Sequence, residues 1–379
     1  MKLFFKTAMI TTFLALFAGS AIFGVYYFFT HNEEEKILFL EKTQTVFYID
    51  KTIEEEKIPE PEIFEEEETE QTCPFTVKIL ISAAGDVTLG GDRRWSGFHA
   101  FMREFDEHGY EYFFSNVEHI FAESDLSIVN FEGVLTDETE PHMDKEFVFR
   151  APTDFAKILK AGNISAVSLA NNHSNDYFQR GYNDTKDALS AAEIEHFGND
   201  STIIIEVNGI KIGLFGHRIW HDSRENHTRI RNSISNLRSQ NAQLIVAYFH
   251  WGVENENIPE QYQINIGRLA VREGADLVLG SHPHVIQRIE KYNERFIVYS
   301  LADFCFGGNA HPADFDAFIF QQEFTFFHGI LQPENEINII PVSLSSVRNR
   351  NDFRPTPAEG AHAERILQRL RELSNGSLF

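Results

Sequence analysis

The stretch Leu277-Val278-Leu279-Gly280-Ser281-His282-Pro283-His284 decides the fold of this chain. It is a short aliphatic run that ends in a glycine and is followed by two histidines one residue apart. Aliphatic runs of this length are typical of fully buried strands. In α/β sheets, ligands bind at the carboxyl ends of the strands. The stretch therefore predicts a buried strand that delivers two imidazoles to a site at the edge of a sheet.

Polar residues follow four other predicted strands in the same way. The groups are Gly85-Asp86, Asn130-Phe131-Glu132-Gly133, Asn171-Asn172-His173 with Asp176, and His250-Trp251-Gly252 with Glu254. The strands that precede them are expected at 77–83, 126–131, 166–169 and 244–249. Longer helical stretches separate these β-rich runs, which indicates an α/β domain. We expect the five strand ends to bring their polar side chains to one spot.

This combination of side chains favours a metal site. Carboxylate, amide and imidazole groups are ligands that Mn, Fe and Zn accept. A carboxylate such as Glu132 can bridge two ions, and the His-X-His spacing places two imidazoles on one side of an extended segment. A two-metal site activates water and clamps a phosphoryl group. A histidine just beyond the metals, such as His173, can protonate the leaving group.

Each motif alone has a plain structural explanation. Gly85-Asp86 is a common turn, and Asn171-Asn172-His173 fits a helix N-cap with a surface histidine. Asp176 and Glu254 can orient other groups or face solvent. Only the ordered set of five strand ends favours one or two divalent ions over these explanations.

The motifs, in this order, resemble the CapA family of capsule and poly-γ-glutamate synthesis proteins, within the calcineurin-like metallophosphoesterase superfamily. The matching pieces are Ala84-Gly85-Asp86-Val87, Asn130 to Gly133, Leu169 to His173, Asp176 to Gly181 with Asp184-Thr185, His250 to Glu254, Gly274 to Val278, Gly280 to Val285 with Gln287, and Tyr299-Ser300-Leu301 with Phe304. The resemblance covers about residues 77–310. It implies a four-layer α/β/β/α sandwich of metallophosphoesterase type with metals at the strand ends.

The resemblance also implies roles for individual residues. Metal contacts are expected from Asp86, Glu132, Asn172, His250, His282 and His284. His173 takes the catalytic position, with Asp176 beside it. Their places in the sequence beside these residues, and not the resemblance, lead us to expect that Asn171, Trp251, Glu254 and Asp303 contact the ligands or the substrate, with Trp251 as a wall of the pocket.

Two positions depart from the superfamily pattern. The usual Asp-X-His opening has Thr88 in place of the histidine, which leaves one metal less well held or absent. The family's Leu-Gly-Asn-Phe is Leu301-Ala302-Asp303-Phe304 here. Asp303 adds a carboxylate close to the expected site.

The first thirty residues predict a membrane anchor. Lys2 and Lys6 precede an uncharged apolar run over 7–30, which is longer than the core of a cleavable signal. The positive-inside rule then keeps the N-terminus cytoplasmic and exports the rest of the chain. A cleaved signal with its site at 18–21 and a buried core helix are the alternatives. The expected location is the cell membrane, single-pass, with the C-terminal domain outside the cytoplasm.

The net charge of −24, from 57 acidic and 33 basic residues, excludes a chain-wide basic footprint for nucleic acid. Residues 31–72 hold 15 of the acids and four lysines, and Pro59 and Pro61 lie among them. Charge repulsion and proline keep such a segment extended. We expect an acidic linker, with an acidic recognition tail as the alternative.

No proline-rich linker divides the chain between 76 and 345, so one domain is expected over 73–345. A helical extension over 346–379 is expected to lie at its periphery. The two cysteines, Cys73 and Cys305, do not form a disulfide framework. They either form one bridge outside the cytoplasm or remain two thiols.

Three functions fit these patterns. The first is a membrane-anchored, outward-facing, metal-dependent phosphoesterase in capsule or poly-γ-glutamate biosynthesis or export. Its substrate is an anionic polymer or a phosphorylated molecule, and its partners are synthase or export subunits. The second is a non-catalytic capsule-assembly subunit with a structural or vestigial metal site. The third is a secreted nucleotidase-like phosphoesterase.

Overall fold

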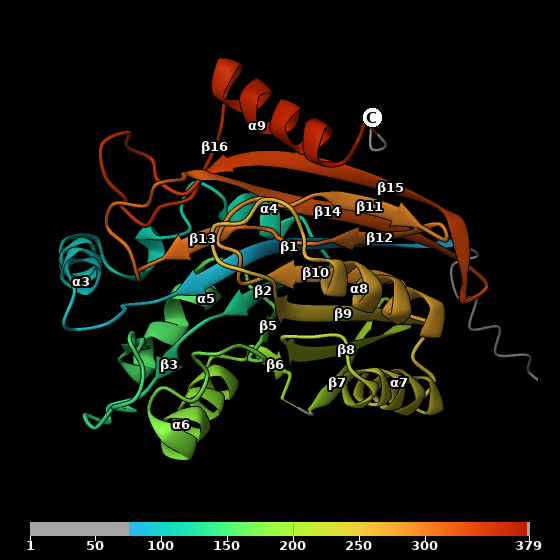
Figure 1. The fold of residues 1–379 in the computed structure, drawn as a ribbon, viewed down its shortest axis with the longest axis horizontal. Helices are drawn as coiled ribbons and strands as arrows, with labels where there is room; N and C mark the ends of the chain where they lie inside the picture. The colour runs from blue at the N-terminus through green and yellow to red at the C-terminus, as the bar shows by residue number, and fades with distance from the viewer. Residues whose placement is uncertain (1–75, 200, 377–379) are drawn as a thin grey trace, which may run out of the picture. The chain divides into compact units, whose positions relative to one another are not determined.

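Two large sheets organise the residues that the computed structural model describes, which are 76–199 and 201–376 (Figure 1). In this part of the chain, eight strands form the first sheet. Their order is β16 (Thr356–Pro357), β15 (Ile330–Ser343), β14 (Asp316–Phe327), β1 (Thr76–Thr88), β2 (Leu126–Phe131), β5 (Ala166–Ser168) and β6 (Glu195–Phe197), with β13 (Asp303–Phe306) paired to β1. β1, β2, β5 and β6 are parallel, as the alternation of strands and helices predicts.

Six strands of the described residues form the second sheet. Their order is β11 (Ile289–Tyr292), β12 (Arg295–Val298), β10 (Leu277–Ser281), β9 (Leu244–Trp251), β8 (Ile210–Ile219) and β7 (Thr202–Val207). The four central strands are parallel, and the hairpin strands β7 and β11 close the two edges. The short strands β3 (Val134–Leu135) and β4 (Arg150–Ala151) pair separately.

The side chains of β9 show how the layers pack. Leu244, Val246 and Tyr248 belong to the larger apolar core, which also contains the buried residues of β1 and β2. The intervening residues of β9 belong to a second core with α7 (Arg224–Ser239) and α8 (Gln261–Glu273). Because successive residues of a strand face opposite sides, the two sheets share one core and the two helices cover the outer face of the second sheet (Figure 1).

The remaining helices contribute buried residues to the larger core or flank the first sheet. They are α3 (Ser96–His108), α4 (Glu118–Ala122), α5 (Ala156–Ala161), α6 (Phe178–Ala191) and α9 (Gly360–Leu373), with single turns η1 (Tyr110–Tyr112) and η2 (Thr153–Phe155). α9 lies along β15 at the outer edge of the view in Figure 1, and its Ile366 and Leu370 are fully buried in the larger core. β16 precedes α9 and extends the first sheet.

The structure is thus a mixed α/β fold with several sheets and helices, as the sequence predicts. The anchor and linker predicted over 1–72 lie outside the described residues, as does Cys73. Cys305 is a fully buried free thiol whose sulfur contacts the carbonyl oxygen of Phe353 at 3.3 Å. No helix within 76–199 and 201–376 has both the length and the apolar character needed to span a bilayer.

Candidate metal centre

Asp86 reaches the site through an irregularity in β1. The strand continues past its expected end at Ala83 to Thr88, and its register with β2 shifts between Ala83 and Asp86. At Gly85 the chain passes so close to its neighbour that an added Cβ would lie 1.7 Å from the carbonyl oxygen of Ala302. Only glycine permits this approach. The approach lets Asp86 pair with Asp303 of β13 and puts two carboxylates side by side.

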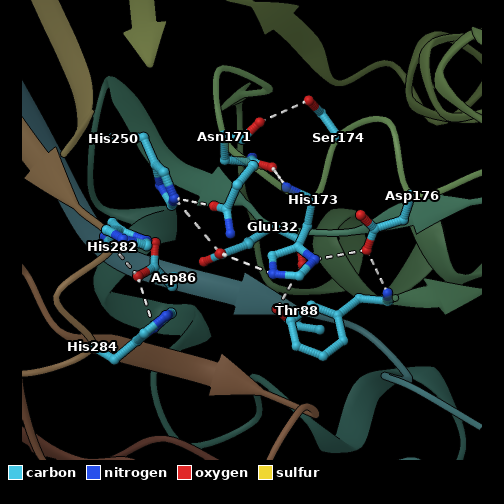
Figure 2. Close-up of polar contacts among 12 residues, drawn as sticks. Asp86, Thr88, Glu132, Asn171, His173, Ser174, Asp176, His250, His282 and His284 are labelled. Atoms are coloured by element: carbon cyan, nitrogen blue, oxygen red, sulfur yellow. Dashed lines mark hydrogen bonds and ion pairs between the residues drawn. The ribbon is translucent and has the colours of Figure 1, made fainter. Parts of the chain in front are cut away.

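Glu132 lies at the centre of the site (Figure 2). It is fully buried, and neither carboxylate oxygen has a hydrogen-bond partner among the described residues. Burial, and next the nearby charge of Asp86, raise the pKa of Glu132 well above its usual value. One of its oxygens lies 3.6 Å from Nε2 of His250 and 4.0 Å from Nε2 of His173. A buried carboxylate without hydrogen-bond partners is costly, and a bound cation would offset that cost.

His250, near the end of β9, supplies a neutral imidazole. Burial, and then the neighbouring His282 and His284, lower the pKa of His250 well below its usual value. Its Nε2 lies 2.5 Å from Oδ1 of Asn172, and its Nδ1 lies 3.1 Å from the hydroxyl oxygen of Ser281. Neutral imidazole is the form that binds metals. The side chains of Asn172 and His250 therefore lie against each other, and their roles as metal ligands stay a prediction.

The two histidines after β10 are held in conformations that non-glycine residues rarely adopt. The φ angles of His282 and His284 are 96° and 58°. Such conformations each cost about 1–3 kcal/mol and cluster at functional sites. Burial, and next His284, lower the pKa of His282 to about 3, and its buried Nδ1 has no partner among the described residues.

His284 has the opposite surroundings. Its Nδ1 lies 2.8 Å from an oxygen of Asp303 and 3.3 Å from an oxygen of Asp86. Burial by itself would lower the pKa of His284, but the carboxylates of Asp303 and Glu132 outweigh it and raise that pKa well above its usual value. Burial raises the pKa of Asp303 to about 6, although His284 opposes the shift.

Three overlapping groups of these side chains fit a metal ion. In each group the ligand atoms lie within 4.8 Å of one another. The groups are Glu132 with His282 and His284, Asp86 with Glu132 and His250, and Asp86 with His284 and Asp303. The overlap at Asp86 and Glu132, together with the unpartnered oxygens of Glu132, fits one or two divalent cations.

His173 and Asp176 form a pair beside these groups. Nδ1 of His173 lies 2.7 Å from Asp176, whose carboxylate is fully buried and also accepts a hydrogen bond from the backbone N–H of Phe149 at 2.6 Å. Lys145 lies 2.5 Å from the other oxygen of Asp176 and donates to the carbonyl of Asn172. The free Nε2 side of His173 faces Glu132 (Figure 2).

The four expected supporting residues have different positions. Asn171 donates to the side chain of Asn130 at 3.1 Å, and Asn130 in turn donates to Asp86 at 2.7 Å. Asp303 joins the site through His284, and Glu254 lines the neighbouring cleft.

Trp251 does not wall the pocket, so that prediction is wrong. It is fully buried in the core with α7 and α8, and its indole N–H donates to the carbonyl of Tyr299. Because His250 faces the site, the next residue of the strand faces the helices.

Thr88 is not a stand-in for the missing histidine. Its hydroxyl donates to the backbone carbonyl of Glu132 at 2.6 Å and so supports the loop that carries this carboxylate. Asp303, the other departure, provides a ligand atom in the group with Asp86 and His284.

Three residues of the site are not singled out by the sequence. The ring of Trp220 lies 4.7 Å from that of His282 and is 41% exposed, so it provides the aromatic wall. Arg218 pairs in register with His250 on the parallel strands β8 and β9 and so shares its face. Trp220 and Arg218 lie at the carboxyl end of β8. Because ligands bind at the carboxyl ends of strands in α/β sheets, the same reasoning applied to this strand would have predicted both residues. Lys145 lies in an irregular loop and gives no such signal.

Arg218 is an exposed cation with no hydrogen-bond or ion-pair partner in the described part of the chain. Partial burial, and next the charge of Arg229, lower the pKa of Arg218. A guanidinium in this state beside a metal centre can bind an anionic group.

A cleft of about 370 Å³ extends from the site. His173, His284, Asp303 and Glu254 line its inner end, and the aromatic side chains of Trp95, Phe147, Phe149 and Phe306 line its walls. The centre is therefore accessible to a small molecule.

Known proteins are similar to the part of the chain that contains these site residues. Residues 80–308 match the family model described as "Bacterial capsule synthesis protein PGA_cap". The chain is 28% identical over 255 residues to the capsule biosynthesis protein CapA of Bacillus anthracis, which covers 60% of each protein. It is 30% identical over 223 residues to the PGA biosynthesis protein CapA of Bacillus subtilis (strain 168), which covers 53% of this chain and 58% of that one.

The matched region thus spans less than two thirds of either relative. Among solved structures, a hypothetical protein from Thermus thermophilus is 13% identical, with a TM-score of 0.43, and covers 69% of this chain and 99% of that one. The family model matches more than half of this chain, and the chain belongs to the family of bacterial capsule synthesis proteins, PGA_cap.

Proposed function

We propose that this chain is a membrane-anchored, outward-facing hydrolase of phosphoester type that depends on divalent metal and acts in capsule or poly-γ-glutamate biosynthesis or export. The observation that carries the proposal is Glu132, a fully buried carboxylate whose two oxygens have no hydrogen-bond partner among the described residues and which shares ligand groups with Asp86 and three histidines. The two packed sheets and their helices support a four-layer metallophosphoesterase sandwich.

The residues around the ligands supply the rest of the chemistry. His173 is held at Nδ1 by Asp176, which leaves Nε2 to give a proton to a leaving group. Arg218 binds an anionic oxygen of the substrate. Bound divalent ions would activate water and polarise the phosphoryl oxygens. Mn, Fe and Zn suit this mixture of carboxylate, amide and imidazole.

The location rests on residues 1–30, whose apolar run and preceding lysines favour a retained anchor with the domain outside the cytoplasm. Residues 31–72 then hold the domain away from the membrane. Polymer synthase or export subunits are the proposed protein partners, and nucleic acid is not.

A non-catalytic assembly subunit is the second candidate. The observation that favours it is Thr88, which makes a structural hydrogen bond where the superfamily has a histidine ligand. The ligand group that includes Asp303 favours the hydrolase, because it offers a third ligand atom on that side of the site.

The test compares the full chain, purified in detergent, with its His250→Ala variant. Phosphomonoester and phosphodiester hydrolysis is measured after loading with Mn, Fe or Zn, with and without chelator. We expect activity that chelator abolishes and that His250→Ala reduces by at least about a hundredfold. Activity untouched by chelator or by the substitution would refute the hydrolase. In cells that make the polymer, an unchanged amount of polymer with the His250→Ala variant would favour the assembly subunit.

A further inference from the structure

The cleft beside the metal centre has aromatic walls that the core does not require. Trp95 is 50% exposed and Phe147 is 38% exposed, and their rings lie 5.4 Å apart. Phe149 continues the wall inward and stacks on the ring of His173 at 4.1 Å. The cleft thus offers exposed aromatic faces to whatever group extends from the reacting centre.

The charges of the cleft are unbalanced. Its lining includes no lysine or arginine within the described part of the chain. Of its carboxylates, Asp303 is paired with His284 at 2.8 Å, and Asp314 accepts from Arg369 at 2.6 Å. Glu254 is exposed and has no hydrogen-bond or ion-pair partner among the described residues. One uncompensated negative charge therefore faces the cleft.

The aromatic walls and the charge of Glu254 favour binding of a cationic group in the cleft over binding of an anionic one. A carboxylate or second phosphate beside Glu254 would meet its negative charge with no lysine or arginine in the described lining to offset it, and like charges brought together oppose binding. Aromatic faces combined with a carboxylate are the usual surroundings of a bound organic ammonium group. Arg218, which is not part of the cleft lining and pairs in register with His250, offers the positive charge that the phosphate requires.

We propose that the cleft holds the leaving-group part of the substrate and that this part carries an amine or ammonium group against Trp95, Phe147 and Glu254. This inference rests on the proposed hydrolase function and narrows its substrate to a small phosphoester of an amino alcohol. In the reaction, the phosphorus–oxygen bond to the amino alcohol breaks, that oxygen takes a proton, and water supplies the oxygen that enters the phosphate.

A matched pair of esters tests the charge preference. Phosphoethanolamine and phosphoserine differ by one carboxylate on the leaving group. With the metal-loaded full chain we expect kcat/KM to be about tenfold higher for phosphoethanolamine. Glu254→Lys should remove or reverse this preference for phosphoethanolamine. The ratio of the two kcat/KM values is compared because a change in metal content affects both esters alike and cancels. The control Glu364→Lys, an exposed change of the same charge on α9, should leave the ratio as in the wild type.

A binding measurement keeps the proposal testable without turnover. Benzyltrimethylammonium should quench the indole fluorescence of the full chain, and Trp95→Phe should remove most of that quenching. Glu254→Lys should weaken the apparent affinity by about tenfold. Loss of turnover with intact quenching would refute the hydrolase and retain the cation site. A ratio or affinity that Glu254→Lys leaves unchanged would overturn the cation site itself.

Discussion

Asp303 is a residue at which this chain departs from the expected family pattern, and it belongs to a group that could hold a metal ion. The family resemblance implies asparagine at this position, whereas Asp303 pairs in register with Asp86 and its carboxylate lies 2.8 Å from Nδ1 of His284. At position 88 this chain has threonine where the resemblance implies a histidine ligand. The carboxylate of Asp303 lies in a group with Asp86 and His284 that could hold a metal ion.

Asp303→Asn, which restores the family residue, should therefore weaken metal binding by at least about tenfold, because an amide is a poorer ligand for these ions than a carboxylate. Metal content after dialysis against a graded chelator measures the effect. Thr88→Ser, which keeps the hydroxyl, is the control and should bind metal like the wild type. Equal retention in Asp303→Asn and wild type would exclude Asp303 as a ligand.

A second prediction concerns the single residue Arg218. Because it neighbours His250 on the same face of the sheet and has no described partner, its guanidinium is free to hold a phosphate oxygen. Arg218→Ala should raise KM for a phosphomonoester about tenfold and leave metal content unchanged. Arg103→Ala, an exposed arginine of α3, provides the control. An unchanged KM, or a parallel loss of metal, would contradict an anion-binding role.

Among the elements, α9 depends on one buried carboxylate. Asp316, at the start of β14, accepts two hydrogen bonds from Arg365, at 2.5 and 2.6 Å, and one from Arg369 at 3.0 Å. Burial by itself would raise the pKa of Asp316, but the bonds from Arg365 and His362 outweigh it and lower that pKa below its usual value. The ionised form therefore stabilises the docking of α9.

Asp316→Asn should lower Tm by about 5 °C at pH 7, which corresponds to about 2 kcal/mol for a charged hydrogen-bond network. Because the folded pKa lies below the unfolded one, this stability is present above about pH 4 and is lost as pH falls through the folded pKa. The Tm difference between variant and wild type should accordingly shrink in acid. A difference that is constant from pH 7 to pH 3 would show that the charge of Asp316 does not matter.

The elements also show what the sequence could and could not predict. From their positions at strand ends, the sequence predicted that Asp86, Glu132, His250, His282 and His284 lie close together, and the structure places them in shared groups. The prediction needs no knowledge of the loops, because parallel strands end at one edge of the sheet. The wrong position of Trp251 came from treating neighbours in the chain as neighbours in the site, although residues of a strand alternate between faces.

Loop geometry marks the limit of such prediction. The bond between Lys145 and Asp176 joins residues 31 positions apart and depends on an irregular loop that has no periodic pattern. The extension of β1 through Asp86 depends on the close approach of Ala302 to Gly85, which is a tertiary contact. The exposed position of Trp95 likewise depends on the loop that carries it.

For the whole molecule, the proposed anchor predicts where the protein lies in the cell. The full chain should sediment with membranes and resist extraction by high salt, because about 20 apolar residues insert stably in a bilayer. Deletion of residues 2–30 should release it. External protease should remove the domain from intact protoplasts, since it is expected outside the cytoplasm. A full chain that stays in the soluble fraction would contradict the anchor.

The central claim is that Glu132 and its neighbours form a metal centre. Its most direct test is the metal content of the full chain, loaded with Mn, Fe or Zn and freed of loosely bound ions, measured beside Glu132→Gln. We predict about two equivalents of metal in the wild type and loss of at least one in the variant, because this carboxylate belongs to two of the three ligand groups. A wild type without bound metal after loading, or a variant that retains the full amount, would contradict the claim.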